Sequence, residues 1–326
     1  QVTTTGAEDG QTVSLLLNGQ TYTGVVSGNN ASITIPASDL QGLTDGSSYT
    51  LTANVSDAAG NAATANTSTT FSVDTTAPTL ALTVGAAGAL VNSSEDTEGT
   101  VVSVASNGAW SVTLTGQSGS VVKTGTSTDT SITLTSLEVT TLGQGAVTVS
   151  GSASDAAGNS TTVAGVNLFS IDTVAPLASI VIDSVTTDNV VNIAEGDSAS
   201  IAITGTVSGD VAVGDIVTVT VNGSDFTGSV AQSGNSKVFS INVSGANLEA
   251  DTGLTVAASV TTTDAAGNST TATATKAYTL DQSAPTITAV TADWGSVLNG
   301  TEDNSNGVIQ VTTTGAEDGQ TVSLLL

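Results

Sequence analysis

The sequence predicts an all-β protein made of tandem β-sandwiches, and three observations predict it. Segments such as 216–221 and 254–260 alternate apolar and polar residues, which is the pattern of strands with one buried face. Asn-Gly pairs at 18–19 and 222–223 favour the tight turns that join such strands into hairpins. An internal repeat is the third observation. No segment shows a convincing helical period.

The repeat is marked by the short string Asp-Ala-Ala-Gly-Asn, which begins at Asp57, Asp155 and Asp264. Residues 310–326 are also identical to residues 1–17, an offset of 309 residues. Fixed-period self-similarity is the signature of a repeat architecture, and the offset divides into three modules of about 100 residues each. About seven short strands in such a length predict an immunoglobulin-like Greek-key sandwich.

A second marker sets the expected module boundaries. The strings VDTTAP, IDTVAP and LDQSAP each end in proline after a short polar run, and their aspartates follow the first marker by a constant 17 residues. Proline in this setting marks a strand edge or a junction. We therefore expect a linear array of four modules, namely 1–76 (the first module, without its first strand), 77–174 (the second), 175–283 (the third) and 284–326 (the start of a fourth).

Charge and composition exclude several classes of partner. The chain has 3 Lys and Arg against 29 Asp and Glu, and its net charge is -26. Nucleic acid is excluded because phosphate binding needs clustered basic residues. The same deficit argues against binding to anionic membrane surfaces. The sequence contains no run of about 18 apolar residues, the length that a membrane-spanning helix needs. Since the chain has no Cys, it has neither a disulfide framework nor a thiolate metal site.

An enzyme is not expected. Without His or Cys, the chain cannot form a Ser or Cys catalytic triad. Aromatic residues make up 3% of the sequence, which leaves little material for the walls of a substrate pocket. The same loop chemistry recurs in every module, as expected of a structural element rather than of a single active site.

The segment 180–223, together with TDAAGN at 263–268 and LDQSAP at 280–285, resembles the bacterial Ig-like repeats of giant Gram-negative adhesins. The resemblance covers the whole chain. The second module departs most, because SNGAW at 106–110 replaces the acidic loop found at 208–215. The resemblance implies export by type I secretion to the bacterial cell surface. It also implies a long stalk with Ca²⁺ at the module junctions, in proteins that serve attachment and biofilm formation.

Topology places the acidic residues at the ends of the modules. In a seven-stranded Ig sandwich, loops B–C and F–G lie at the upstream end, where the chain enters, and loops A–B and E–F lie at the downstream end. The first marker lies in the F–G loop, and the second lies in the connector into the same end. The candidate ligands are Asp57, Asp155 and Asp264 in F–G loops; Asp74, Asp172 and Asp281 in connectors; Glu95, Asp96, Glu195 and Asp197 in A–B loops; and Asp210 and Asp215 in a B–C loop.

Each connector should therefore collect carboxylates from two modules. The expected groups are Asp74 with Asp155; Asp172 with Glu95, Asp96, Asp264 and Asp210 or Asp215; and Asp281 with Glu195, Asp197, Glu249 or Asp251, and Glu317 or Asp318.

Converging carboxylates repel one another, and three lysines are too few to neutralise them. Ca²⁺ accepts 6–8 oxygen ligands in loose geometry, whereas Mg²⁺ prefers rigid octahedral sites and Zn²⁺ lacks its usual His and Cys ligands. The alternative for any single acid is a solvated loop residue. For the Asp of the first marker the alternative is a tight turn, in which Asp accepts local hydrogen bonds and Gly supplies a positive φ. Both roles are compatible.

A stalk whose partners are its own neighbouring modules is the function that these features favour. Two alternatives stay open in the sequence. Exposed sandwich edges could pair laterally between chains to build a filament or sheath. A module could also bind a ligand directly, although loops with so few aromatic residues offer little for sugar or protein recognition.

Overall fold

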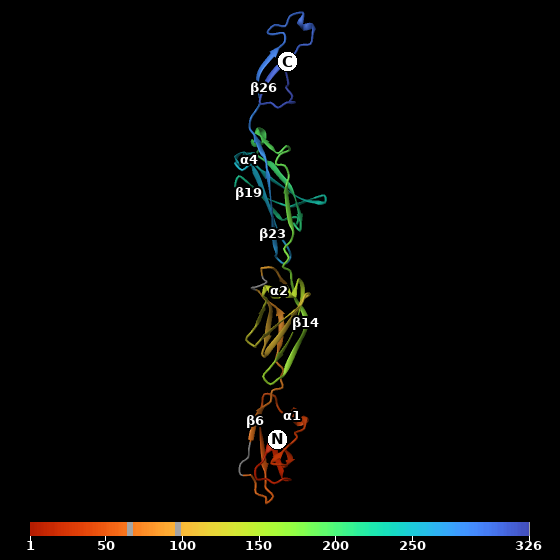
Figure 1. Cartoon of the computed structure of the whole chain (residues 1–326), viewed down its shortest axis with the longest axis vertical. Helices are drawn as coiled ribbons and strands as arrows, with labels where there is room; N and C mark the ends of the chain where they lie inside the picture. The colour runs from red at the N-terminus through yellow and green to blue at the C-terminus, as the bar shows by residue number, and fades with distance from the viewer. Residues whose placement is uncertain (64–67, 95–98, 326) are drawn as a thin grey trace. The chain divides into compact units, whose positions relative to one another are not determined.

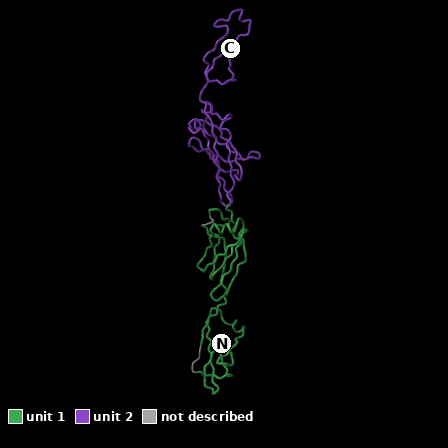
Figure 2. The backbone as a smooth tube through the Cα atoms, viewed as in Figure 1, with its two compact units in different colours: residues 1–173 green, residues 174–326 purple. Residues whose placement is uncertain are grey.

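The computed structural model of this protein describes residues 1–63, 68–94 and 99–325. Strands dominate and pair into sheets that pack as Ig-like sandwiches, which confirms the predicted all-β fold class. The chain divides into two compact units, residues Gln1–Thr173 and Val174–Leu326 (Figure 2). No helix among the described residues is long and apolar enough to cross a membrane.

The third module forms a complete two-layered sandwich (Figure 1). One sheet contains, in order, β15 (Ala178–Ile182), β17 (Ile201–Gly209), β21 (Ser236–Val243) and β20 (Ala231–Ser233). The other contains β19 (Ser224–Ser229), β18 (Ile216–Val221), β22 (Thr255–Thr263) and β23 (Ser269–Ala277). A parallel pair of β16 (Val190–Asn192) and β24 (Thr279–Asp281) precedes the connector. The strands predicted from the alternating pattern at 216–221 and 254–260 are therefore present.

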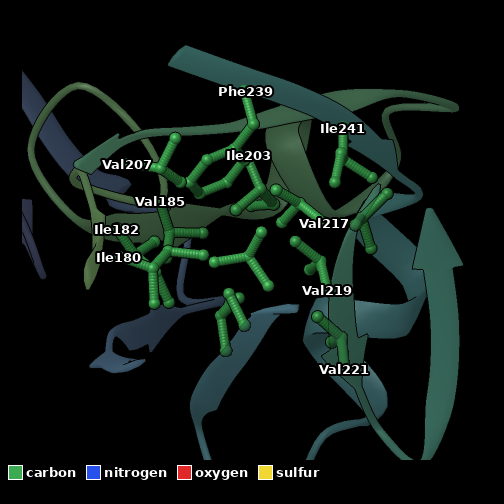
Figure 3. Close-up of a cluster of buried hydrophobic side chains, with 14 of the residues drawn as sticks. Ile180, Ile182, Val185, Ile203, Val207, Val217, Val219, Val221, Phe239 and Ile241 are labelled. Carbon is green, nitrogen blue, oxygen red and sulfur yellow. The ribbon is translucent and has the colours of Figure 1, made fainter. Parts of the chain in front are cut away.

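The core of this module lies between the two sheets and is built mostly of β-branched side chains. Figure 3 shows Ile203 and Phe239 from one sheet meeting Val217 from the other. Burying one such side chain contributes about 1.5–3 kcal/mol. Many aliphatic contacts therefore replace the aromatic ones that this composition lacks.

The second module repeats the plan. Its larger sheet contains β11 (Ser120–Gly125), β10 (Ala109–Thr115), β13 (Gly145–Ser154), β14 (Ser160–Ile171) and β8 (Leu90–Val91), and its smaller sheet contains β12 (Ser131–Thr133), β9 (Thr100–Ser106) and β7 (Leu80–Val84). Trp110 is buried in the core, and its indole Nε1 donates to the carbonyl of Thr126 at 2.9 Å. The polar tip of this large side chain is therefore satisfied.

The first module has one four-stranded sheet, of β3 (Gln20–Val25), β2 (Thr12–Leu17), β5 (Ser48–Val55) and β6 (Ser68–Ser72). Its second layer is reduced to a pair, β1 (Val2–Thr3) and β4 (Asn30–Ala31). In the fourth module, β25 (Thr286–Ala292) pairs with β26 (Ile309–Thr314), and the 3₁₀ turn η1 (Glu302–Asn304) lies between them.

Among the described residues, four short helices are the main departure from the sequence prediction, which included no helix. They are α1 (Ala37–Gln41), α2 (Ser136–Leu142), α3 (Ile193–Gly196) and α4 (Gly245–Ala250). Such short helices give no periodic pattern, and N-cap side chains specify α2, α3 and α4. Thr135 with Glu138, and Asn192 with Glu195, form capping boxes that satisfy the first backbone N–H groups of α2 and α3. Helices α1, α2 and α4 each precede the strand that leads into an Asp-Ala-Ala-Gly-Asn turn.

Candidate metal centre

The Asp-Ala-Ala-Gly-Asn segments form a closed turn with the same hydrogen bonds in all three modules. In the second module, the backbone N–H of Asn159 donates to Oδ1 of Asp155 at 2.9 Å, and Nδ2 of Asn159 donates to Oδ2 at 2.9 Å. The backbone N–H of Asp155 donates to the carbonyl of Asn159 at 3.1 Å. Gly158 has φ +95°, a conformation that glycine adopts without strain. The turn predicted for this string is therefore confirmed.

The other two turns repeat these contacts. The backbone N–H and Nδ2 of Asn61 donate to Asp57 at 2.7 and 2.8 Å, and those of Asn268 donate to Asp264 at 2.9 and 3.0 Å. In each turn the hydrogen bond from the Asn side chain is the main cause that lowers the pKa of the Asp carboxyl. A carboxylate oxygen has two lone pairs, so an Asp that holds its own turn retains capacity for a cation.

The turn of the second module lies against the connector that enters that module. Nδ2 of Asn159 donates to the backbone carbonyl of Asp74 at 3.0 Å and lies 3.4 Å from Oδ1 of Asp74. One amide group therefore links the carboxylates of Asp74 and Asp155, the two residues expected to share this junction. Their ligation of a metal stays a prediction.

A carboxylate that the sequence analysis missed also binds this connector. Asp45, which follows α1, accepts hydrogen bonds from the backbone N–H of Thr75 at 2.5 Å and from the hydroxyl of Thr76. These bonds, that of the Thr76 hydroxyl first, lower the pKa of Asp45. In the second module Gln144 makes the equivalent contact, because its Oε1 accepts from the backbone N–H of Thr173 at 2.9 Å. The contact therefore does not require a charge.

The B–C loops of the second and third modules contact the connectors that enter them. In the second module Oδ1 of Asn107 accepts from the backbone N–H of Thr79 at 2.7 Å. In the third module Oδ2 of Asp210 accepts from the backbone N–H of Leu177 at 2.8 Å. Asp210 thus lies beside the connector at the upstream end, as expected for a B–C loop. Asp215 instead stabilises its own turn, because its Oδ2 accepts from the backbone N–H of Ala212 at 2.8 Å.

The A–B loop of the third module lies at the downstream end with the E–F loop, since the backbone N–H of Gly245 donates to the carbonyl of Ser198 at 2.9 Å. Within this loop Glu195 has a structural role that the sequence analysis missed. Its Oε2 accepts from the backbone N–H of Asn192 at 3.1 Å to complete the capping box of α3. Asp197 ends the same helix. Glu95 and Asp96, the corresponding acids of the second module, lie outside the described residues.

The connector after the third module borders a cavity of about 580 Å³, whose lining includes Asp188, Asn192, Asp281 and Glu317. Asp281 and Glu317 were expected at this junction, whereas Asp188 was not. Oδ1 of Asp281 accepts from the backbone N–H of Ser283 at 2.9 Å, and Oδ1 of Asp188 accepts from that of Val190 at 3.0 Å. The bond from Val190 is the main cause that lowers the pKa of Asp188. Asp188, Asp281 and Glu317 therefore each bring a carboxylate to the lining of this cavity.

Within residues 1–63, 68–94 and 99–325, no three acidic side chains form a cluster that could hold a metal ion. The expected group of Asp172 with Asp264 joins residues of the two different units, and it stays a prediction. In the described part of the chain, Lys123 forms an ion pair with Glu138 at 2.6 Å.

Comparison with known proteins decides the family. Residues 36–135 match the bacterial Ig-like domain (group 3). A solved structure of a Ca²⁺-stabilised adhesin, with which an Antarctic bacterium reaches out and binds ice, is 31% identical to this chain, with a TM-score of 0.59. That match covers 96% of this chain and 76% of the other. The chain belongs to the bacterial Ig-like repeats of large adhesins.

A second solved structure, from another bacterial adhesin, supports the assignment. It comes from work on the host cell surface retention of a 1.5-MDa bacterial ice-binding adhesin and is 26% identical to this chain. The match covers 84% of this chain and 87% of the other, with a TM-score of 0.51. No curated protein matches the chain. Bacterial Ig-like repeats of this family are typically structural, non-catalytic modules.

Proposed function

We propose that this chain is a stalk segment of a bacterial cell-surface adhesin, in which Ca²⁺ at the module junctions stiffens the array. The stalk holds a distal adhesive domain away from the cell for attachment to a surface or for biofilm formation. The observation that carries this proposal is the amide of Asn159, which ties the F–G turn at Asp155 to the connector at Asp74. The relative stabilised by Ca²⁺ supports the choice of ion.

The residues at two connectors carry oxygen ligands of the kind that a hard cation prefers. Around the first connector stand the carboxylates of Asp74 and Asp155 with the carbonyl of Asp74. At the connector after the third module, Asp188, Asp281 and Glu317 line one cavity but do not form a cluster of three carboxylates. Ca²⁺ accepts carboxylate, amide and carbonyl oxygens in flexible geometry, and extracellular modules bind it at roughly 10⁻⁴–10⁻³ M. A bound ion would supply the positive charge that these junctions lack.

The protein's own contribution is to fix the connector before an ion arrives. Asp45 of the upstream module accepts a hydrogen bond from the backbone N–H of Thr75. Asn107 of the downstream module accepts one from the backbone N–H of Thr79. These neutral and charge-assisted hydrogen bonds define where the connector aspartate lies. At low Ca²⁺ inside the cell, repulsion between junction carboxylates would keep the chain loose enough for type I secretion. Outside, ion binding would be linked to ordering of the junctions.

A charge-matched pair of variants tests the proposal. Asp281→Asn removes one carboxylate from the cavity at the third connector, whereas Asp225→Asn removes one from the hairpin strand β19, where it accepts from the hydroxyl of Thr220 at 2.6 Å. Isothermal titration with CaCl₂ should show one site weakened about tenfold in Asp281→Asn, because Ca²⁺ affinity follows the number of charged ligands. Asp225→Asn should match the unmodified chain. Equal titrations for all three proteins would contradict the assignment.

A further inference from the structure

The chain enters and leaves the third module through strands that pair with each other in the same direction. It enters through β15 and β16, and it leaves through β23 and β24. β16 pairs with β24 in parallel, with Val190 opposite Thr279 and Asn192 opposite Asp281. All residues of this module, 175–283, are described. Within it, this pair is the one strand pairing that joins the entry side of the chain to the exit side.

Tension along the chain therefore acts on this pair in shear. A pull on the upstream connector draws β16 toward the upstream end, and a pull on the downstream connector draws β24 the opposite way. The hydrogen bonds of a parallel pair are evenly spaced along the strands, so they are loaded together when the strands slide past each other. A strand that is peeled away sideways loads its hydrogen bonds one after another. The pairing of β16 with β24 is thus the arrangement that resists tension better.

Two side-chain amides add hydrogen bonds to this pairing. At the upstream end the backbone N–H of Thr279 donates to the carbonyl of Asn189 at 3.2 Å, and Nδ2 of Asn189 donates to the carbonyl of Ala277 at 2.8 Å. At the downstream end Nε2 of Gln282 donates to the carbonyl of Val191 at 3.2 Å. Bonds from residues outside the short strands therefore extend the pairing at both of its ends.

Both strands are anchored in the body of the module. Val191 of β16 is fully buried, and Leu280, which lies opposite it on β24, packs against the same core cluster. Tyr278, which precedes β24, is 3% exposed, and its hydroxyl donates to the carbonyl of Leu248 in α4 at 2.6 Å. A sliding movement of the strands must also pull these side chains out of the core, so the core resists the same movement.

The second module has an equivalent pair with a different sequence. Its entry strand β8 pairs in parallel with its exit strand β14. The backbone N–H of Ser170 donates to the carbonyl of Ala89 at 2.8 Å, and that of Asp172 donates to the carbonyl of Val91 at 2.9 Å. Tying of the entry side to the exit side is therefore common to both modules.

We propose that the parallel pair of β16 and β24 is a mechanical clamp, whose rupture limits the unfolding of the third module under tension. The proposal rests on the proposed stalk function, because a stalk that holds an adhesive domain carries the tension between the cell and the surface. Asn189 and Gln282 strengthen the clamp. Unfolding under force is governed by the unfolding rate, so the clamp prolongs the lifetime of the loaded module more than it adds to the equilibrium stability.

Stretching of single full-length chains at constant force, in excess chelator, tests the clamp without a contribution from Ca²⁺. Gln282→Ala removes one side-chain hydrogen bond from the clamp. Asn189→Gly removes the bond to Ala277, and glycine accepts the φ of +66° at this position. Gln232→Ala is the matched control, because Nε2 of Gln232 donates to the carbonyl of Gly234 at 2.9 Å, in the turn that joins β20 to β21. The third module is recognised by its released length, since 175–283 is longer than 77–174.

The lifetime of the third module under load should fall about fivefold in each clamp variant, the change in rate that one lost hydrogen bond produces. Gln232→Ala should leave this lifetime unchanged, although chemical denaturation should show similar small losses of stability in Gln282→Ala and Gln232→Ala. Equal lifetimes in the clamp variants and the control overturn the proposal. A shorter lifetime that only matches a faster unfolding rate in denaturant also overturns it, because the effect is then general destabilisation.

The chelator keeps this test separate from the proposed role of Ca²⁺. Failure of the clamp variants to shorten the lifetime leaves the calcium titration of the junctions unaffected. Conversely, a chain that binds no Ca²⁺ still shows the clamp, since its hydrogen bonds join protein groups only.

Discussion

The side-chain amide of Asn159 donates a hydrogen bond to the backbone carbonyl of Asp74 at 3.0 Å, across 85 residues of sequence. The same nitrogen donates to Oδ2 of Asp155 at 2.9 Å. A turn that is closed by local hydrogen bonds therefore also holds the connector that leads into its module. The Asn159 side chain therefore has two roles: it closes the turn with Asp155, and it binds the connector at Asp74.

Removal of the Asn159 amide should weaken the first connector. Asn159→Ala deletes the donor to Asp74 and Asp155, and we expect a loss of about 0.5–1.5 kcal/mol in the free energy of unfolding, which is the net contribution of a typical intramolecular hydrogen bond. Chemical denaturation of the chain measures it. Asn54→Ala is the matched control, because the Asn54 side chain is exposed on β5, and its effect should stay within about 0.5 kcal/mol. Equal losses in the two variants would contradict the role of the amide.

Asp45 should be replaceable by a neutral acceptor. Since Gln144 makes the equivalent contact in the second module, Asp45→Asn should retain the hydrogen bond from the backbone N–H of Thr75, whereas Asp45→Ala should lose it. Amide hydrogen exchange at Thr75 reads out this bond. We expect faster exchange at Thr75 in Asp45→Ala only. Equally fast exchange in both variants would show that the charge, and not the acceptor, holds the connector.

The turn aspartates should make stability fall in acid. The pKa of Asp155 is below its usual value of 3.8 in the folded chain. A depressed folded pKa contributes stability that is present above the unfolded value and is lost as the pH falls through the folded value. An NMR titration of the side-chain carboxyl should therefore place the midpoint of Asp155 below 3.8. A midpoint at or above the usual value would refute the hydrogen-bonded turn in solution.

Destabilisation of the core of the third module should leave the stability of the second module unchanged. Phe239 is 2% exposed in a cluster that contains only residues of the third module. Phe239→Ala should cost about 3–5 kcal/mol and lower one melting transition, while the transition of the second module, with its own cluster around Trp110, stays in place. Val213→Ala is the control, because Val213 is 57% exposed. A shift of every transition in Phe239→Ala would mean that the modules do not unfold independently.

Strand order made much of this arrangement predictable from the sequence. The F–G position of Asp155 and the constant step to the connector placed Asp155 beside Asp74, and the B–C position placed Asp210 beside its own connector. Asp45 and Gln144 were missed because an Asp in one module and a Gln in the next make the same hydrogen bond to the connector. The position is therefore not marked by a residue type that repeats in the sequence. Glu195 was assigned to a metal from its charge and its A–B loop position, and this ligation stays a prediction. The capping box that it forms with Asn192, three residues before it, was missed.

Small-angle scattering during a calcium titration tests the central claim most directly. If Ca²⁺ stiffens the junctions, addition of CaCl₂ to the chelated chain should increase the maximum dimension, and the melting temperature should rise in parallel through ligand linkage. MgCl₂ at the same concentration is the control for ionic screening and should reproduce little of the change. A scattering profile that is the same in excess chelator and in saturating Ca²⁺ would contradict the proposed stalk mechanism.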